Sequence, residues 1–340
     1  MFRWLIAAIA AGCSSGWVVV SVAGRWWDAP PAWFVVAVVF LPVLWCAAAA
    51  PWLLAWAVHP RGVGAPVGLT LHLLAAAASF SGPAHSTPSG DSVRVMWWNV
   101  QRLWGAPEAS ACVSTELAAA DPHIFVLGEV TAADAAVLGD PLGAHCVHAP
   151  YRAAEHSGLA VCVRRGVTVV HSGGQPYVDS DPWQYLAAEL AWRDTVFNVL
   201  AVHLTPYAFS LRQPADVNAA AQLGESVQRS QSDQAAVLVA RLQKLKDPTL
   251  VVGDFNSTRD AALHVALRRL LVDTWSVAGR GRGATAFLWG KIPLRVDFQY
   301  ATEDLRPAHV AVLRVDCSDH RPVVLDMVPH GPTDPASARR

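Results

Sequence analysis

The polar residues of this chain that could do chemistry fall in six short motifs, each at the edge of an apolar run. Together they hold hard oxygen ligands for a cation, candidate bases, and hydrogen-bond donors for a developing negative charge. Metal-assisted hydrolysis of a phosphate ester requires that combination. One such motif is a weak signal, but six in one chain favour this chemistry. The motifs are Trp98-Asn99, Leu127-Gly128-Glu129-Val130, His203-Leu204-Thr205-Pro206, Gly253-Asp254-Phe255-Asn256, Val296-Asp297-Phe298 and Cys317-Ser318-Asp319-His320-Arg321-Pro322-Val323.

The elements that must position these motifs alternate between strand-like and helix-like segments after residue 90. Glu129, His203, Asp254 and Asp319 each follow an apolar strand directly, so each is expected to project from a strand end. Polar residues at several strand ends can converge on one rim, where ligands commonly bind. Paired strands with helices between them predict two packed sheets flanked by helices. Strands are expected at 93–98, 124–127, 159–163, 167–170, 186–192, 196–202, 250–252, 294–300, 309–315 and 323–325, and helices near 109–120 and at 228–246.

Residues 1–90 differ in composition from the rest of the chain. They hold eight of the fifteen Trp residues but only three basic residues and one acidic residue. Apolar runs of about 20 residues span a bilayer as helices, and Trp near their ends suits the interfacial belts. The sequence therefore predicts a transmembrane region at 1–81, with helices at about 4–23, 32–58 and 63–81. The third run is less apolar, so two spans and a helix on the membrane surface are the alternative.

Basic residues in the short loops indicate the orientation of the domain that follows. With three spans, Arg3 and Arg61 share one side of the membrane, while Arg25 and the domain share the other. The positive-inside rule then places the domain outside the cytoplasm, at the plasma membrane of a bacterium; with two spans it would be cytoplasmic. Ala10-Ala11-Gly12-Cys13 resembles a lipoprotein cleavage box, but the apolar run continues beyond it, which favours an uncleaved first helix.

A Gly/Pro/Ser-rich linker is expected at 82–90, followed by a globular domain at 91–327 and a flexible tail at 328–340. The domain is mildly acidic, so its composition carries no basic footprint of nucleic-acid binding.

The domain also holds four cysteines without the spacing of a zinc site. A disulfide between Cys112 and Cys146 would suit an external domain, and four buried thiols, which include Cys162 and Cys317, are the alternative.

The order of the six motifs resembles that of the endonuclease/exonuclease/phosphatase superfamily, the DNase I-like fold, from residue 91 to about 327. The resemblance implies an α+β fold, a four-layer α/β/β/α sandwich, preceded here by two or three transmembrane helices. It also implies hydrolysis of phosphodiesters or phosphomonoesters with Mg²⁺, or with Mn²⁺ or Ca²⁺, as cofactor. Two positions depart from the family pattern. Gln101 stands where many nucleases have an acidic residue, and Gly128 stands where the family usually has Gln.

The resemblance also assigns a role to each polar position. His320 would act as general base on water, with Asp297 holding its ring in one tautomer. Asp297 stands between two apolar residues, where an unpaired carboxylate would be costly, so a partner for it is expected. The predicted catalytic residues are His320, Asp297, His203, Asp254 and Asn256, the predicted metal ligands are Glu129, Asn99 and Asp319, and the predicted substrate contacts are Tyr151, Asn256 and Thr285.

These features predict a membrane-anchored, divalent-metal-dependent phosphoesterase, first of all a phosphodiesterase or endonuclease that uses a His–Asp activated water. Its expected partners are a phosphoester substrate, either nucleic acid or a phospholipid or small phosphoester, and the lipid bilayer; no protein partner is evident. A sphingomyelinase-like or inositol-phosphatase-like enzyme is the alternative. A binding domain without catalysis is disfavoured because most motif positions are kept, and a membrane scaffold or transporter because the apolar spans hold no charge.

Overall fold

The computed structural model describes residues 91–101, 107–152, 156–177, 183–206, 217–288 and 292–329. Apart from Asp260–Val265, these residues belong to one compact unit. The predicted transmembrane helices, the predicted linker at 82–90 and residues 330–340 of the predicted tail lie outside the described residues. Within the described ranges, no helix is both long enough and apolar enough to cross a membrane.

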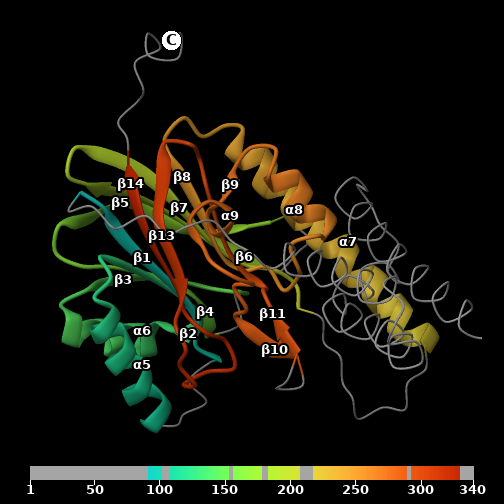
Figure 1. The fold of residues 1–340 in the computed structure, drawn as a ribbon, viewed down its shortest axis with the longest axis horizontal. Coiled ribbons are helices and arrows are strands. Elements are labelled where there is room, and N and C mark those ends of the chain that lie inside the picture. The colour runs from blue at the N-terminus through green and yellow to red at the C-terminus, as the bar shows by residue number, and fades with distance from the viewer. Residues whose placement is uncertain are drawn as a thin grey trace, which may run out of the picture. The chain divides into compact units, whose positions relative to one another are not determined.

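Two six-stranded sheets form the body of this unit (Figure 1). The first has the order β13-β14-β1-β2-β4-β3 and the second the order β5-β6-β7-β8-β12-β9. The strands of the first sheet are β1 (Val93–Asn99), β2 (Ile124–Thr131), β3 (His145–Pro150), β4 (Ser157–Val163), β13 (Leu305–Val312) and β14 (Val323–Pro329). The strands of the second sheet are β5 (Val167–Pro176), β6 (Gln184–Trp192), β7 (Thr195–His203), β8 (Thr249–Asp254), β9 (Val272–Asp273) and β12 (Asp297–Ala301), and a separate hairpin is formed by β10 (Ala286–Leu288) and β11 (Ile292–Leu294).

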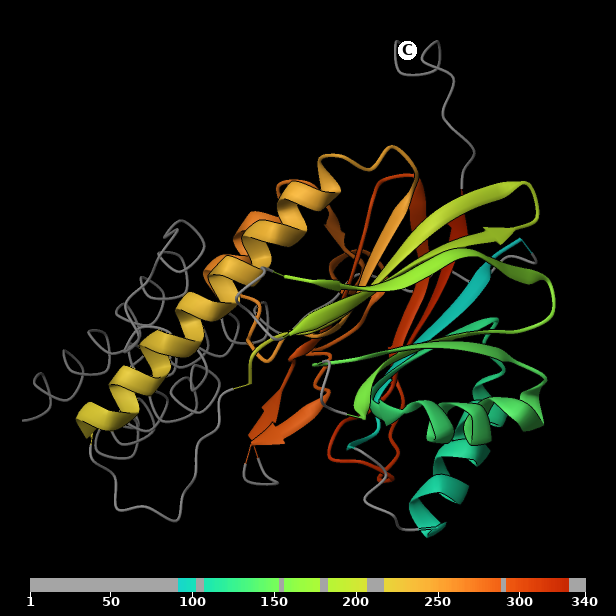
Figure 2. The same ribbon diagram turned by 180° about the vertical axis from the view of Figure 1, so that it is seen from behind.

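The sheets face each other across a shared apolar core, to which β1 contributes Trp97 and β7 contributes Val199. The other face of the first sheet packs against α5 (Pro107–Ala120) and α6 (Ala132–Gly139). Helix α7 (Val217–Leu242) runs on the side of the second sheet (Figure 2). The expected two-sheet α+β sandwich of DNase I-like type is confirmed. The shorter helices are η2 (Asp140–Leu142), α8 (Ala262–Leu267) and α9 (Thr274–Ala278).

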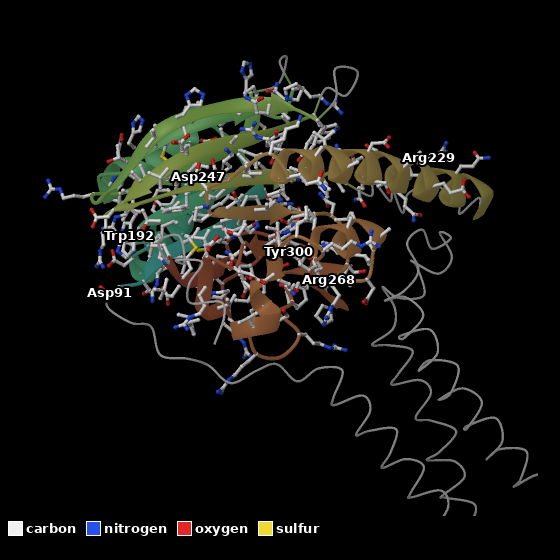
Figure 3. All side chains as sticks on the ribbon, turned by 90° about the horizontal axis from the view of Figure 1, so that it is seen from above. Asp91, Trp192, Arg229, Asp247, Arg268 and Tyr300 are labelled. Atoms are coloured by element: carbon white, nitrogen blue, oxygen red, sulfur yellow. A yellow bond between two sulfur atoms is a disulfide. The ribbon has the colours of Figure 1, made fainter. Side chains whose placement is uncertain are left out.

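Two consecutive tryptophans of β1 enter different cores because side chains alternate along a strand. Trp97 lies in the core between the sheets, whereas Trp98 lies in the core beneath α5. Figure 3 shows the side chains of the unit, with Tyr300 and Arg229 among those labelled. Tyr300 of β12 is fully buried, while Arg229 of α7 extends outward.

Strand register lines up the polar residues of the motifs. The parallel pair β1–β2 sets Asn99 beside Gly128, and the parallel pair β7–β8 sets His203 beside Asp254. The antiparallel pair β8–β12 sets Asp254 beside Asp297. Strand pairing alone therefore brings His203, Asp254 and Asp297, from three motifs far apart in sequence, to the same end of three adjacent strands.

The expectation that Glu129 follows a strand end is wrong. Strand β2 continues to Thr131, and Glu129 lies inside it. The pairing of β2 with β4 shifts between Gly128 and Val130, which leaves Glu129 at a φ of 56°. Such a bulge adds one residue to a strand and re-aims its side chain.

Three other expected elements have different bounds. Helix α7 begins at Val217, before the expected start at residue 228. Its first half was not predicted because it is rich in Ala and polar residues that show no apolar period. Strand β13 ends at Val312 and not at residue 315. The strand expected at 294–300 is interrupted before Asp297, where β12 begins.

The cysteines form two disulfides, Cys112–Cys317 and Cys146–Cys162. Both the suggested Cys112–Cys146 bridge and the alternative of four thiols are wrong. Cys146 and Cys162 face each other across β3 and β4, whereas Cys112 of α5 reaches Cys317 over 205 residues of sequence. Strand register and helix packing decide these pairs, and neither is visible in the cysteine spacing.

The substitution Gly158→Ala is expected to destabilise the fold. A Cβ on Gly158 of β4 would come within 2.0 Å of the Ala149 carbonyl oxygen and 2.5 Å of the Pro150 Cα. Backbone atoms cannot rotate away, so the sheet must shift, at a cost of about 1–3 kcal/mol in the free energy of unfolding.

Urea unfolding measures this cost. The matched control is Gly173→Ala in β5, where the nearest atom to the added Cβ is 3.8 Å away. Equal stability of the two variants would contradict the close approach of β3 and β4.

Candidate active site

Asn99 connects the polar residues of the two sheets. Its Nδ2 donates to Oε1 of Glu129 in the first sheet at 3.1 Å and to Oδ2 of Asp254 in the second at 3.2 Å. Its Oδ1 accepts the backbone N–H of Gln101 at 3.0 Å, which fixes the orientation of the amide. The two carboxylates are therefore held close together by one buried side chain.

The bulge and Tyr151 direct Glu129 toward a cluster of polar side chains. The cluster consists of Asn99, Glu129, His203, Asp254, Asp297 and His320. The backbone N–H of Glu129 donates to the Tyr151 hydroxyl oxygen at 2.6 Å, and Oε1 lies 3.5 Å from Nε2 of His203. Burial alone would raise the pKa of Glu129, but the hydrogen bond and charge of His203, together with the Asn99 amide, lower it to about 2. Glu129 is therefore a carboxylate at neutral pH.

His203 packs against two aromatic rings that also contact each other, and it faces both carboxylates. The ring centroids of Tyr151 and Trp183 lie 4.6 Å and 5.6 Å from that of His203. Its Nε2 is 3.7 Å from Oδ2 of Asp254, in addition to its approach to Glu129. A proton on Nε2 thus points at the centre of the cluster.

Asp297 has the partners that its burial demands, as expected. Its Oδ1 accepts the indole N–H of Trp97 at 2.7 Å, and its Oδ2 lies 2.8 Å from Nδ1 of His320. Its backbone N–H donates to the Thr285 hydroxyl at 3.2 Å. These contacts place the other ring nitrogen of His320, Nε2, 3.7 Å from Oδ2 of Asp254.

The carboxylates and the histidine change each other's pKa. Burial alone would lower the pKa of His320, but Asp297 and Asp254 raise it to about 10. Burial and the charge of Asp297 raise the pKa of Asp254 to about 6, although His320 and His203 oppose the change. In the absence of a cation, His320 therefore holds its proton at neutral pH.

Asn256 belongs to a loop that α7 holds in place. Its backbone N–H donates to Oδ1 of Asp254 at 2.7 Å, and its Nδ2 donates to the Leu204 carbonyl at 2.9 Å. From α7, Nε2 of Gln231 donates to the carbonyls of Thr205 at 2.8 Å and of Asn256 at 3.2 Å. One buried glutamine thus ties together the loops that follow His203 and Asp254.

Three predicted site residues lie outside the centre of the cluster. Tyr151 and Thr285 are fully buried, and they support Glu129 and Asp297 through the hydrogen bonds described above. Asp319 is exposed, and its Oδ1 lies 3.3 Å from the Ser318 hydroxyl oxygen. Substrate contacts by Tyr151 and Thr285, and metal binding by Asp319, stay predictions.

The acidic cluster suits a hard cation. Asp254, Asp297 and His320 each offer an atom within 4.8 Å of the others. Asp297 is engaged by the Trp97 indole and the His320 ring, whereas Asp254 and Glu129 are brought together by the Asn99 amide. Asp254 and Glu129 are therefore the pair of carboxylates that would face an ion such as Mg²⁺, which takes only one or two from protein. The Asn99 amide nitrogen faces these carboxylates, so its oxygen is turned away from them.

The tryptophans that support the site were not predicted from the sequence. The indole N–H of Trp97 binds Asp297, and that of Trp98 donates to the His320 backbone oxygen at 2.9 Å. Both were expected only as apolar residues of a strand. A buried indole N–H usually has a partner, so two tryptophans directly before Asn99 were a usable signal. Trp183, which stacks on His203, follows no motif and carried no such signal.

The substitution His320→Gln is expected to flatten the dependence of stability on pH in the metal-free protein. The pKa of His320 is about 10 in the fold against 6.5 ordinarily. Its proton therefore stabilises the fold fully below pH 6.5, and this contribution is lost as the pH rises toward 10. Urea unfolding in EDTA across this range should show a steeper fall in the free energy of unfolding for wild type than for the variant. Parallel curves would contradict the pairing of His320 with Asp297.

Comparison with known proteins agrees with this geometry. The sequence profile described as the Endonuclease/Exonuclease/phosphatase family matches residues 96–320. The match includes the first five motifs and the sixth as far as His320, and it begins after the first three residues of β1. No curated protein matches the chain.

Solved structures share the fold at low sequence identity. The human Nocturnin catalytic domain with a bound sulfate anion is 19% identical, with a TM-score of 0.55 over 71% of this chain and 96% of that chain. The complex of D. rerio TDP2 with a single strand DNA product is 15% identical, with a TM-score of 0.56 over 69% and 98%. A mannosyl-6-phosphatase of Bacteroides thetaiotaomicron VPI-5482 is 14% identical, with a TM-score of 0.52 over 70% and 100%. The family match, the shared fold and the arrangement of the motif residues lead to one conclusion: the chain belongs to the endonuclease/exonuclease/phosphatase family of hydrolases acting on phosphoester bonds.

Proposed function

We propose that this protein is a membrane-anchored, divalent-metal-dependent phosphodiesterase in which His320 activates the attacking water. The observation that carries the proposal is the pair formed by Asp297 and His320. Oδ2 of Asp297 lies 2.8 Å from Nδ1 of His320, and the other ring nitrogen, Nε2, faces Asp254. A histidine oriented by a carboxylate on one nitrogen can take a proton on the other.

One proton is transferred to His320 in this step. Nε2 of His320 takes the proton of the attacking water, while the N–H at Nδ1 stays bonded to Asp297, which stabilises the imidazolium that forms. Asp254 orients the nucleophile or assists the leaving group. His203 and Asn256 donate hydrogen bonds to the phosphate as negative charge builds on it.

Glu129 and Asp254 would hold the cation, with Asp319 as a further predicted contact. Asn99 was also predicted as a ligand, but its amide nitrogen faces the two carboxylates, so its role here would be to orient them. When bound, an ion such as Mg²⁺, Mn²⁺ or Ca²⁺ would polarise the phosphoryl oxygen and offset the charge of the transition state. The acidic cluster raises the pKa of His320, so neutralisation of Asp254 favours the unprotonated ring that a base requires.

Two arginines beside aromatic rings support nucleic acid as the substrate. The guanidinium of Arg152 lies 4.8 Å from the Trp183 ring, which stacks on His203. The guanidinium of Arg321, next to His320 in the chain, lies 4.4 Å from the Phe287 ring. Aromatic faces can stack on bases, and guanidinium groups bind phosphates. The similar fold of D. rerio TDP2, solved with a single strand DNA product, agrees with this choice.

A phospholipid or small phosphoester is the second candidate, because the apolar runs expected within 1–81 would tether the domain beside a bilayer. The two disulfides support an extracytoplasmic domain at a bacterial plasma membrane, since such bonds persist mainly in oxidising compartments.

The substitution His320→Ala is expected to lower turnover by about 10²–10⁴-fold, because the general base is lost. The assay uses the full chain in detergent with Mg²⁺ or EDTA, on bis-p-nitrophenyl phosphate, plasmid DNA and a choline phospholipid. Circular dichroism confirms that the variant is folded, and His171→Ala, at an exposed position of β5, is the matched control. Full activity of His320→Ala would contradict the mechanism, and the preferred substrate decides between nuclease and lipid hydrolase.

The substitution Glu129→Gln is expected to raise the Mg²⁺ concentration needed for half-maximal activity by about 10–100-fold, because one negatively charged oxygen ligand becomes a neutral amide. A Mg²⁺ titration at fixed substrate measures this change. Glu303→Gln, in an exposed turn, is the control. Unaltered Mg²⁺ dependence in Glu129→Gln would remove this residue from the metal site.

A further inference from the structure

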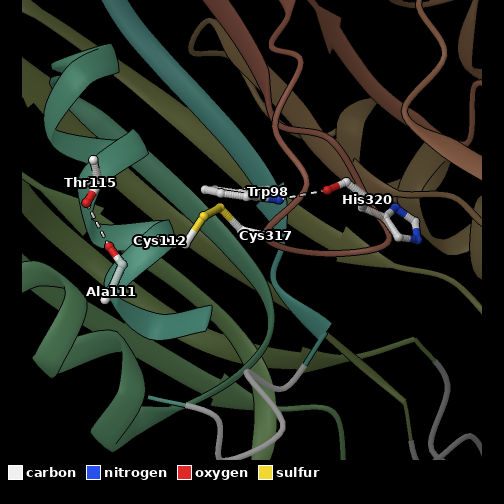
Figure 4. Close-up of a disulfide and its surroundings, with 6 residues drawn as sticks. All are labelled: Trp98, Ala111, Cys112, Thr115, Cys317 and His320. Carbon is white, nitrogen blue, oxygen red and sulfur yellow. Dashed lines mark hydrogen bonds between the residues drawn. A yellow bond between two sulfur atoms is a disulfide. The ribbon is translucent and has the colours of Figure 1, made fainter. Parts of the chain in front are cut away.

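A disulfide connects α5 to the segment that carries His320. Cys112 belongs to α5, and Cys317 lies three residues before His320 in the connection between β13 and β14. Figure 4 shows this disulfide beside the indole of Trp98, whose hydrogen bond leads to the backbone oxygen of His320. The bond therefore lies close, along the chain and in space, to the residue on which the proposed chemistry depends.

The segment from 313 to 322 belongs to no helix or strand, apart from an isolated bridge between His320 and Ala286. Side-chain and hairpin contacts hold its second half: the Ser318 hydroxyl donates to the Asn99 carbonyl at 2.8 Å, and the Arg321 N–H donates to the Thr285 carbonyl at 2.7 Å. Besides the peptide chain at its two ends, the Cys112–Cys317 disulfide attaches this segment covalently to the domain.

Helix α5, which carries Cys112, is fixed by packing against the first sheet. Val113 and Leu117, which flank the turn of α5 after Cys112, are fully buried in the same core as Trp98. Cys317 packs against that core as well. The disulfide thus joins the His320 segment to the layer of helices that covers the first sheet.

We propose that the Cys112–Cys317 disulfide is a positioning element for His320, so that full turnover requires this bond. The inference rests on the proposed function, in which Nε2 of His320 takes a proton 3.7 Å from Asp254. Without the tether the segment gains freedom, and a shift of about 1 Å in a reacting group can lower turnover by about 100-fold. The loss should appear mainly in kcat. The rise in KM should be smaller, because two of the proposed phosphate contacts, His203 and Asn256, lie outside this segment and only Arg321 lies within it.

Cys112 is exposed, so a dithiol in solution can reach the bond. The dithiol gives up two electrons and two protons and becomes a cyclic disulfide. The Cys112–Cys317 bond breaks, and each sulfur becomes a thiol. An oxidant such as oxidised glutathione reverses the change.

The second disulfide provides a matched control within the same chain. Cys146 and Cys162 join the neighbouring strands β3 and β4, and Cys162 is fully buried in the sheet. This pair has the same chemistry but no attachment to the His320 segment. Serine replacement of either pair therefore separates general effects of losing a disulfide from effects on His320.

The experiment measures kcat and KM on bis-p-nitrophenyl phosphate with Mg²⁺, before and after dithiothreitol, in the full chain. Three proteins are compared: wild type, Cys112→Ser/Cys317→Ser and Cys146→Ser/Cys162→Ser. Wild type should lose about 10–100-fold in kcat on reduction and regain it on reoxidation. The Cys112→Ser/Cys317→Ser variant should have the low kcat from the start and ignore the reductant, whereas Cys146→Ser/Cys162→Ser should behave as wild type.

Near-UV circular dichroism and thermal melting accompany each rate. A folded Cys112→Ser/Cys317→Ser variant with the kcat of wild type would overturn the inference, and so would a loss of kcat that tracks a loss of the near-UV signal. If that variant does not fold, reversible reduction of wild type below its melting temperature gives the same test. Oxidised wild type without His320-dependent turnover would instead contradict the proposed function, so the two failures are distinguishable.

Discussion

The structure of the site depends on one buried carboxylate. Asp297 is 1% exposed, and a charge in such a place is tolerable only when it is paired and hydrogen-bonded. Its two oxygens take their partners from the other sheet: the Trp97 indole from β1 and the His320 ring from the connection between β13 and β14. The hydrogen bonds that stabilise the Asp297 carboxylate therefore also position the proposed base, and they connect the two sheets.

The remaining acids differ because their surroundings differ. Glu129, beside His203 and Asn99, has its pKa lowered to about 2, whereas burial and the charge of Asp297 raise the pKa of Asp254 to about 6. Two nearby carboxylates with separated pKa values can serve different roles, one as a permanently charged ligand and the other in proton transfer. The same crowding of negative charge explains why a cation is expected here.

Residues at the ends of regular strands could be predicted from the sequence. His203, Asp254 and Asp297 come together because register alone makes them neighbours, and the apolar flanks of Asp297 correctly indicated a partner. The position of Glu129 was not predictable in the same way, because its bulge depends on pairing with β4 and on a hydrogen bond to Tyr151. The disulfide pairs were equally hidden, since helix packing and strand register bring distant cysteines together.

The protonation state of His320 in the metal-free protein shows whether this ring is paired with Asp297. Nitrogen NMR of the metal-free protein labelled in its histidine rings can follow this one ring as the pH rises, with His320→Gln to assign its signals. We expect the His320 ring to keep both N–H protons well above pH 6.5, and Asp297→Asn to lower the pH at which the ring loses one of them. A wild-type ring that titrates near pH 6.5, as in a solvent-exposed histidine, would contradict the pairing on which the proposed mechanism is built.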